Sequence, residues 1–178
     1  MFDLQPELSG PTLLLRPLRP DDRDRLYELA RDPRLWEQHP DRLRWQPDGF
    51  AVFFDGALAS GGALLALHRE TEEVVACSRW YEVDPDTRSC AIGYTVIRYE
   101  RWGDGTNAAL KRLMLDHSFT GAQTVWFHVA VQNHRSCRAV EKLGAICTLE
   151  APRTMAGIEV PYRNYRLDRD VWLARRHD

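Results

Sequence analysis

The stretch SCAIGYTVIRYERWGDGTNAALKRLMLDHSF, residues 89–119, constrains the fold more than any other part of this chain. An apolar, β-branched run typical of a strand breaks at Gly103 and Gly105, and a helical spacing of apolar residues follows. We expect a strand at 89–97, a helix at 106–119 and a strand at 124–132. The helix then serves as a crossover that places the last strand parallel to and beside the first.

The remaining segments predict one mixed α/β domain over residues 1–178. We expect strands at 12–17, 63–68 and 73–83 and two more that close the chain. A helix opened by Pro20 and capped by Asp21, a second at 50–61 and a third at 134–143 complete the set. The segment between the first two helices is rich in Pro, Trp and Arg and reads as a loop. The fold class is therefore α/β (α+β), with a mixed, largely antiparallel sheet of about seven strands and four main helices.

Composition limits the classes of partner. The chain of 178 residues has 44% apolar residues, 28% charged residues and a net charge of −2, as expected for one globular domain with a substantial core. This balance gives no bulk attraction to nucleic acid or to an anionic membrane. Cys77, Cys90, Cys137 and Cys147 lack zinc-type spacing and read as buried thiols. No signal peptide or membrane span is recognised, so we expect a cytoplasmic protein without a metal site.

The glycine corner has two interpretations. The first amides of a helix that begins near Thr106 have no partner within the helix and carry a partial positive charge. If Gly103 and Gly105 adopt positive φ, these amides can converge on a pyrophosphate, with Arg98 and Arg101 nearby. The alternative is a surface turn with two glycines.

A second motif, VQNHRSCRAVEKLGA at residues 131–145, favours the first interpretation. Asn133 ends a strand and is a natural N-cap for the next helix. Ser136 shares one helical face with the apolar residues Ala139, Val140 and Leu143, so its hydroxyl points inward. Alternatively, the Ser136 hydroxyl bonds only to the backbone of its own helical turn.

Together, RYERWGDGTNAALKRLMLDHSF and NHRSCRAVEKLGA resemble the GNAT superfamily of acetyl-CoA-dependent N-acetyltransferases. LLLRPLRPDDRDRLYELARDP and DPDTRSCAIGYTVI extend the likeness over most of the chain. Within the superfamily, the chain is most similar to the branch that contains the ribosomal-protein N-terminal acetyltransferases.

The resemblance implies a sheet splayed between its fourth and fifth strands, with acetyl-CoA as cosubstrate in the opening. The pantetheine arm would pair with the fourth strand at Tyr94, Thr95, Val96, Ile97 and Arg98. The pyrophosphate would bind the backbone of Arg101, Trp102, Gly103, Asp104, Gly105, Thr106 and Asn107. Asn133 would bond the arm or the acetyl end, and Ser136 would face the thioester sulfur and protonate it as it leaves.

The sequence departs from the pattern of this branch where a glutamate that can act as a base is usual, because Ala91 stands there. Glu82, Asp84 and His128 are the candidates to replace it, although each also suits a solvated or core role. The leading prediction is an N-acetyltransferase, and the alternative is a non-catalytic acyl-CoA-binding or regulatory protein. A third hypothesis is an interaction module on a GNAT-like scaffold.

The acceptor would be a primary amine, either a protein N-terminus or a small molecule, bound by a monomer or homodimer. The loop after the first helix and the third strand offer Trp36, His39, Trp45 and Tyr81 as acceptor-binding residues. The tryptophans also suit a role in covering the core.

Overall fold

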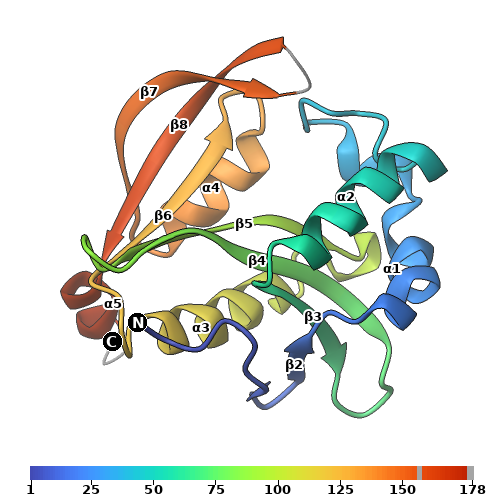
Figure 1. Cartoon of the computed structure of the whole chain (residues 1–178), viewed down its shortest axis with the longest axis horizontal. Coiled ribbons are helices and arrows are strands. Elements are labelled where there is room, and N and C mark those ends of the chain that lie inside the picture. The colour runs from blue at the N-terminus through green and yellow to red at the C-terminus, as the bar shows by residue number, and fades with distance from the viewer. Residues whose placement is uncertain (156–157, 176–178) are drawn as a thin grey trace.

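The computed structural model describes residues 1–155 and 158–175, which form one eight-stranded sheet with helices on both faces (Figure 1). The strands are β1 (Leu8–Ser9), β2 (Leu13–Pro17), β3 (Ala63–His68), β4 (Val74–Asp84), β5 (Ser89–Ile97), β6 (Thr124–Ala130), β7 (Ile146–Met155) and β8 (Ile158–Asp168). The helices are α1 (Arg23–Ala30), α2 (Pro47–Ala59), α3 (Thr106–Ser118), α4 (His134–Lys142) and α5 (Arg169–Arg175).

The strands follow the order β1-β2-β3-β4-β5-β6-β8-β7, and β5–β6 is the one parallel pair of the described sheet. This pair is bonded only at Ser89–Ala91 against Thr124–Trp126. Beyond these positions the two strands separate, and Figure 1 shows them diverging towards α4. The splayed, mixed sheet predicted from the sequence is confirmed.

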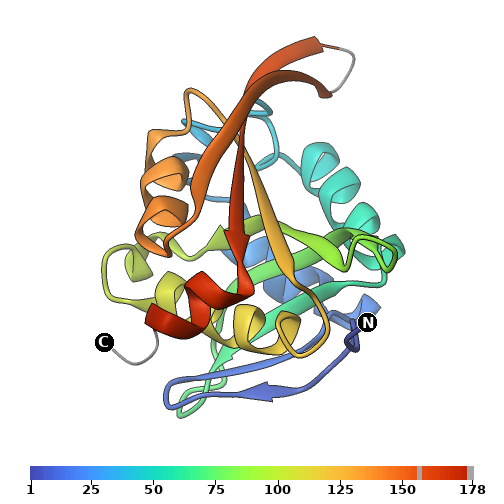
Figure 2. The same ribbon diagram turned by 90° about the vertical axis from the view of Figure 1, so that its left-hand side faces the viewer.

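Two apolar cores fix the helices on the faces of the sheet. One core joins α3, α4 and α5 to the sheet through residues such as Leu110, Met114 and Trp80. The other joins α1 and α2 through Leu26, Phe50 and neighbouring residues. Figure 2, turned by 90°, shows α3, α4 and α5 on the side of the sheet that faces the viewer. The cleft between β5 and β6 is therefore flanked by both layers.

Some details differ from the sequence-based expectations. The helix predicted at 50–61 spans Pro47–Ala59, and β1 and α5 were not anticipated. Cys147 is exposed, in contrast to the other three cysteines, so its predicted burial is wrong.

The predicted capping role of Asp21 is also wrong, because Asp22 is the N-cap residue of α1 and no side-chain capping bond is made there. Asp22 accepts a bond from the backbone N–H of Arg19 at 2.8 Å. It is also paired with Arg16 of β2 at 2.6 Å in a largely buried contact. This ion pair fastens the start of α1 to the sheet.

Candidate functional site

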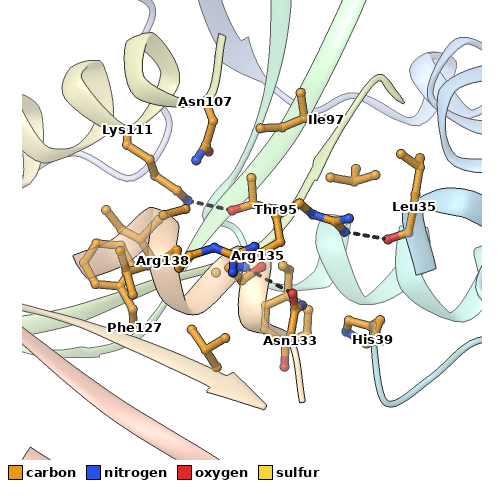
Figure 3. A pocket seen from close by; sticks show the side chains of 18 of the residues that line it. Leu35, His39, Thr95, Ile97, Asn107, Lys111, Phe127, Asn133, Arg135 and Arg138 are labelled. Atoms are coloured by element: carbon orange, nitrogen blue, oxygen red, sulfur yellow. Dashed lines mark hydrogen bonds between the residues drawn. The ribbon is translucent and has the colours of Figure 1, made fainter. Parts of the chain in front are cut away.

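A cavity of about 550 Å³ occupies the opening between β5 and β6. Its walls come from β5, β6, the start of α3, the inward face of α4 and the loop before α2 (Figure 3). Two segments that are distant in sequence, the glycine corner and the Asn133 helix start, therefore meet at one cleft.

The glycine corner has the backbone that the sequence predicts. Gly103 and Gly105 have φ values of 84° and 95°, and Gly105 is the N-cap residue of α3. Nothing lies within 4 Å of a Cβ built on either residue, so backbone conformation and not crowding requires glycine. Asp104 accepts the Thr106 N–H at 2.8 Å and fixes the turn. The corner thus presents exposed backbone at the positive end of a helix.

The residues predicted to hold a cofactor fall into two groups. Eleven of the fourteen line the cavity directly: Tyr94, Thr95, Val96, Ile97, Arg101, Trp102, Gly103, Gly105, Asn107, Asn133 and Ser136. Arg98, Asp104 and Thr106 lie outside the lining. Arg98 turns to β4, where it bonds the Val74 carbonyl at 3.1 Å and pairs with Glu73 at 3.0 Å.

A bulge interrupts β5 at the wall of the cleft. Cys77 of β4 faces Val96, but Arg79 faces Gly93, so β5 holds one extra residue between these positions. Tyr94 takes up the difference with φ at 51°. Bulges of this kind leave backbone groups without ladder partners, and here they lie beside the cavity. Gly93 is required because a Cβ there would lie 2.9 Å from the Tyr81 ring.

The start of α4 carries the second motif. The Asn133 side chain accepts the Ser136 N–H at 3.2 Å, which confirms the predicted N-cap. Ser136 lines the cavity. Arg135 was not singled out in the sequence: its guanidinium stacks on Trp102 at 3.6 Å and bonds the Leu35 carbonyl. It links the loop before α2 to the glycine corner.

Lys111 is the most unusual residue of the cleft, and sequence reasoning missed it. It projects from α3 into the opening, is only 5% exposed, and its Nζ donates to Thr95 Oγ1 at 2.6 Å (Figure 3). Burial lowers its pKa to about 7. One sequence signal could have identified it: Lys111 is one of only two lysines in an arginine-rich chain and stands among apolar residues of a helix.

A second, smaller pocket adjoins the first and is lined by His39, Tyr81, Tyr94, His128, Arg153, Thr154 and Tyr162. His39, Tyr94, His128 and Tyr162 line both cavities. Burial, followed by the Arg44 charge, lowers the pKa of His39 to about 4. The two cavities therefore meet at these four shared residues.

Two of the three candidate replacement bases meet at this junction. His128 Nε2 lies 3.1 Å from Glu82 Oε2, and Arg153 pairs with the same carboxylate at 2.9 Å. His128 Nδ1 lies 2.6 Å from Asn164 Oδ1, and the Asn164 amide nitrogen donates to a carbonyl. The Nδ1 proton therefore points to Asn164, and a proton on Nε2 is held between that nitrogen and the Glu82 carboxylate, so His128 and Glu82 act as a coupled pair.

The charges around His128 oppose each other. Burial and then Arg153 lower the pKa of His128, whereas Glu82 and Asn164 act to raise it. Burial acts to raise the pKa of Glu82, but Arg153 and His128 outweigh it and hold that pKa below its ordinary value. Asp84, the third candidate, bonds Thr87 and the Asp86 amide in an exposed turn and lines neither pocket.

The predicted acceptor residues are also divided. Trp36 and His39 line the main cavity, and Tyr81 lines the adjoining pocket. Trp36 is buried and donates its ring N–H to the Ala30 carbonyl at 2.8 Å. Trp45 lines neither pocket and packs against the core beneath α1 and α2.

The family model for the acetyltransferase (GNAT) domain matches residues 12–146. The chain belongs to the GNAT acetyltransferase family. Enzymes of this family use acetyl-CoA.

Solved structures share this fold. The GNAT protein is similar to a GCN5-related N-acetyltransferase from Brucella melitensis, with TM-score 0.77, 17% identity, and coverage of 96% of this chain and 81% of that one. It is similar to a GNAT-family acetyltransferase from Bacillus anthracis, with TM-score 0.75, 13% identity, and coverage of 93% and 99%.

A third similar structure is spermidine N-acetyltransferase from Vibrio cholerae in complex with CoA and spermine. It has TM-score 0.69 and 17% identity, and the match covers 92% of this chain and 99% of that one. A search of curated protein sequences finds no significant match.

Two further findings concern the described residues only. No group of three or more His, Cys, Asp or Glu side chains is arranged to hold a metal ion in residues 1–155 and 158–175. None of the helices in those ranges is long and apolar enough to cross a membrane.

Proposed function

We propose that this GNAT protein transfers an acetyl group from acetyl-CoA to a primary amine. The observation that carries the proposal is a single cleft that begins at the amide-rich glycine corner, follows β5 to the Tyr94 bulge, and meets a second pocket at His128. Such a cleft can bring two reactants together from different sides.

The residues present fit acetyl-CoA. Four cations line the cavity from the corner and from α4: Arg101, Arg135, Arg138 and Lys142. With the exposed backbone of Gly103 and Gly105, they offer an anion site of the kind that holds phosphates. Thr95 to Ile97 of β5 then line the path for the pantetheine arm. When bound, acetyl-CoA supplies an activated acetyl group as a thioester.

Each remaining step has a residue placed for it. The backbone of the Tyr94 bulge can donate to the carbonyl oxygen as negative charge develops. The His128–Glu82 pair can take up a proton from the amine and hold it between Nε2 and the Glu82 carboxylate. Ser136 at the start of α4 can donate a hydrogen bond to the sulfur. The site therefore has a base although Ala91 stands where a glutamate is usual. Glu82 of β4 and His128 of β6 supply this base together.

The charge of the lining bears on the acceptor. Among the described residues, neither cavity is lined by an Asp or Glu side chain. The pKa of His39, of Lys111 and of His128 is lowered, in each case chiefly by burial. An environment that favours neutral bases also favours a neutral amine, and it disfavours a polycation. We therefore propose a protein N-terminus or a small amine with one basic nitrogen as the acceptor, in keeping with the ribosomal-protein N-terminal branch suggested by the motifs.

Thiol release from acetyl-CoA tests this function. Short peptides with free N-termini and simple monoamines should stimulate release, whereas spermine at the same concentration should not. Mass spectrometry should find the acetyl group on the amine nitrogen. Failure of every acceptor class, with CoA binding intact by calorimetry, would favour the alternative of a non-catalytic acyl-CoA-binding protein. Absence of CoA binding at millimolar ligand would exclude both.

A further inference from the structure

Lys111 is a buried amine in the part of the cleft beside Thr95 and Phe127, which we call its inner end. Its Nζ lies between the two strands as they part, bonded to Thr95 of β5 and 5.9 Å from the Phe127 ring centre of β6. Thr95 is four residues beyond the last β5 position paired to β6, and Phe127 is one residue beyond the last paired position of β6. The amine therefore lies in the opening itself, between the unpaired part of β5 and the first unpaired residue of β6.

The hydrogen bonds of Lys111 are incomplete within the described protein. Its Nζ donates to Thr95 Oγ1 at 2.6 Å and to Ser78 Oγ at 3.3 Å. The two hydroxyls lie 2.8 Å apart, and Ser78 donates to the Gly93 carbonyl at 3.3 Å. An ammonium group has three N–H donors, so one remains, on the side where Lys111 lines the cavity.

Lys111 also lacks a carboxylate partner among the described residues, where every ion pair involves other side chains. The elements around it contribute Ser78 from β4, Thr95 from β5 and, as titratable or charged groups lining the same cavity, His128 from β6 and Arg135, Arg138 and Lys142 from α4. Burial alone accounts for the lowered pKa. An amine in such a place is poised to exchange a proton near neutral pH.

We propose that Lys111 is the proton donor to the sulfur of CoA as it leaves. The proposal rests on the proposed function, because it needs the thioester at the inner end of the cleft. With the diphosphate at the glycine corner and the arm along β5, the acyl end of the donor would lie by the Tyr94 bulge, next to Thr95 and its partner Lys111; Lys111 and Ser136 both line this cavity.

The chemistry balances. The amine nitrogen bonds to the acetyl carbon, the carbon–sulfur bond breaks, and its electron pair stays on sulfur. The ammonium of Lys111 gives one proton to that sulfur and becomes a neutral amine, while the acceptor nitrogen loses its proton to His128. Solvent returns a proton to Lys111 and removes one from His128 when the products leave. A thiol has a pKa of about 8.5, above the pKa of about 7 for Lys111, so the transfer to sulfur is downhill.

Turnover measurements provide the first test. Lys111→Met keeps the length and apolar stem of the side chain and should lower kcat by roughly 10²-fold, the lower range for general acid catalysis. Lys111→Arg keeps the charge but cannot give up its proton, and should be similarly slow. Arg112→Met, the neighbouring exposed cation on α3, is the matched control and should turn over as wild type. Ser136→Ala should lose only a few-fold, as for one hydrogen bond.

The pH profile separates proton donation from a structural role. Wild-type kcat should fall as the pH rises above about 7, because Lys111 must be protonated to act, and this falling limb should be absent from both Lys111 variants. If Lys111→Arg restores wild-type turnover with an unchanged profile, charge alone matters and the proposal is wrong. Unchanged kcat in a folded Lys111→Met variant would overturn it as well, while leaving the acetyltransferase function intact.

A second readout does not depend on activity. The chain has two lysines, Lys111 and Lys142, so protein with isotope-labelled lysine gives two side-chain NMR signals, assigned with Lys111→Met. The Lys111 signal should titrate near pH 7 and should shift on addition of CoA, and an ordinary pKa near 10 would contradict the proposal. Acetylated Lys111, found by mass spectrometry after incubation with acetyl-CoA, would show a nucleophile instead of a proton donor.

Discussion

Both ends of the cleft carry basic side chains, but the outer end at the glycine corner exposes them to solvent and the inner end at Lys111 buries them. At the outer end, Arg138 and Lys142 are exposed on α4 beside the glycine corner. At the inner end, Lys111 is 5% exposed and has lost most of its affinity for a proton. Solvated cations hold a permanent charge and suit phosphate binding, whereas desolvated bases change charge near neutral pH and suit proton transfer. Depth in the cleft, more than residue type, decides the role.

Substitution of His128 at the inner end should have the largest effect on the rate of amine acetylation. His128→Phe keeps a ring but removes the basic nitrogen, and should lower kcat/KM for amine acetylation by roughly 10²-fold or more. The wild-type rate should rise as pH increases through a value below 6.5, because the pKa of His128 is lowered and only the neutral ring accepts a proton. Asp84→Asn is the control, since Asp84 lines neither pocket. Equal losses in both variants would exclude His128 as the base.

An intermediate effect is expected at the outer end. Gly105→Ala places a Cβ on a residue with φ at 95°, which costs about 1–2 kcal/mol of folding stability. It should also turn amides away from the diphosphate and weaken CoA binding about tenfold, as for one hydrogen bond to a charged group.

Gly61→Ala is the matched control for that change. Gly61 has φ at 62°, has nothing within 4 Å of a built Cβ, and lines neither pocket. It should lose similar stability in thermal unfolding but bind CoA as wild type by calorimetry. Equal CoA affinity in both variants would remove the corner from the binding site.

The smallest expected effect is on the free energy of unfolding, and it tests whether the pKa of Lys111 is lowered in the folded chain. The unfolded chain holds the Lys111 proton up to about pH 10, whereas the folded chain releases it near pH 7. The unfolded state binds more protons between these values, so the free energy of unfolding should rise with pH across that window. The Tm of wild type should increase from pH 7 to pH 9 by a few degrees relative to Lys111→Met. Parallel curves would show that Lys111 keeps an ordinary pKa.

The same contrast explains what the sequence could predict. The outer end is encoded locally: Gly103, Gly105 and Asn133 act through the backbone of their own segments, and the structure has these backbone features as expected. The parallel pairing of β5 and β6 followed from the strand–helix–strand order, whereas their splay was expected only from the family resemblance. Such features depend on short-range rules of capping and turn conformation.

The inner end depends on contacts that no local rule specifies. Lys111 meets Ser78 across 33 positions of the chain, and His128 meets Glu82 across 46. Local pattern could name His128 and Glu82 only as separate candidates, and it could not distinguish them from Asp84. The short α5 was missed for a similar reason, because its Trp172 is held by a bond to Asp116 of α3.

The three paired positions between β5 and β6 have a mechanical consequence. They form a short seam between two blocks, one built on β1–β5 and the other on β6, β8 and β7 (Figure 1). A molecule that lies in the opening and bonds to both blocks adds contacts between them beyond the three paired positions. Rigidity of the whole sheet is then a property of the loaded protein, and slow hydrogen exchange in β6 and β8 on addition of CoA is its expected signature.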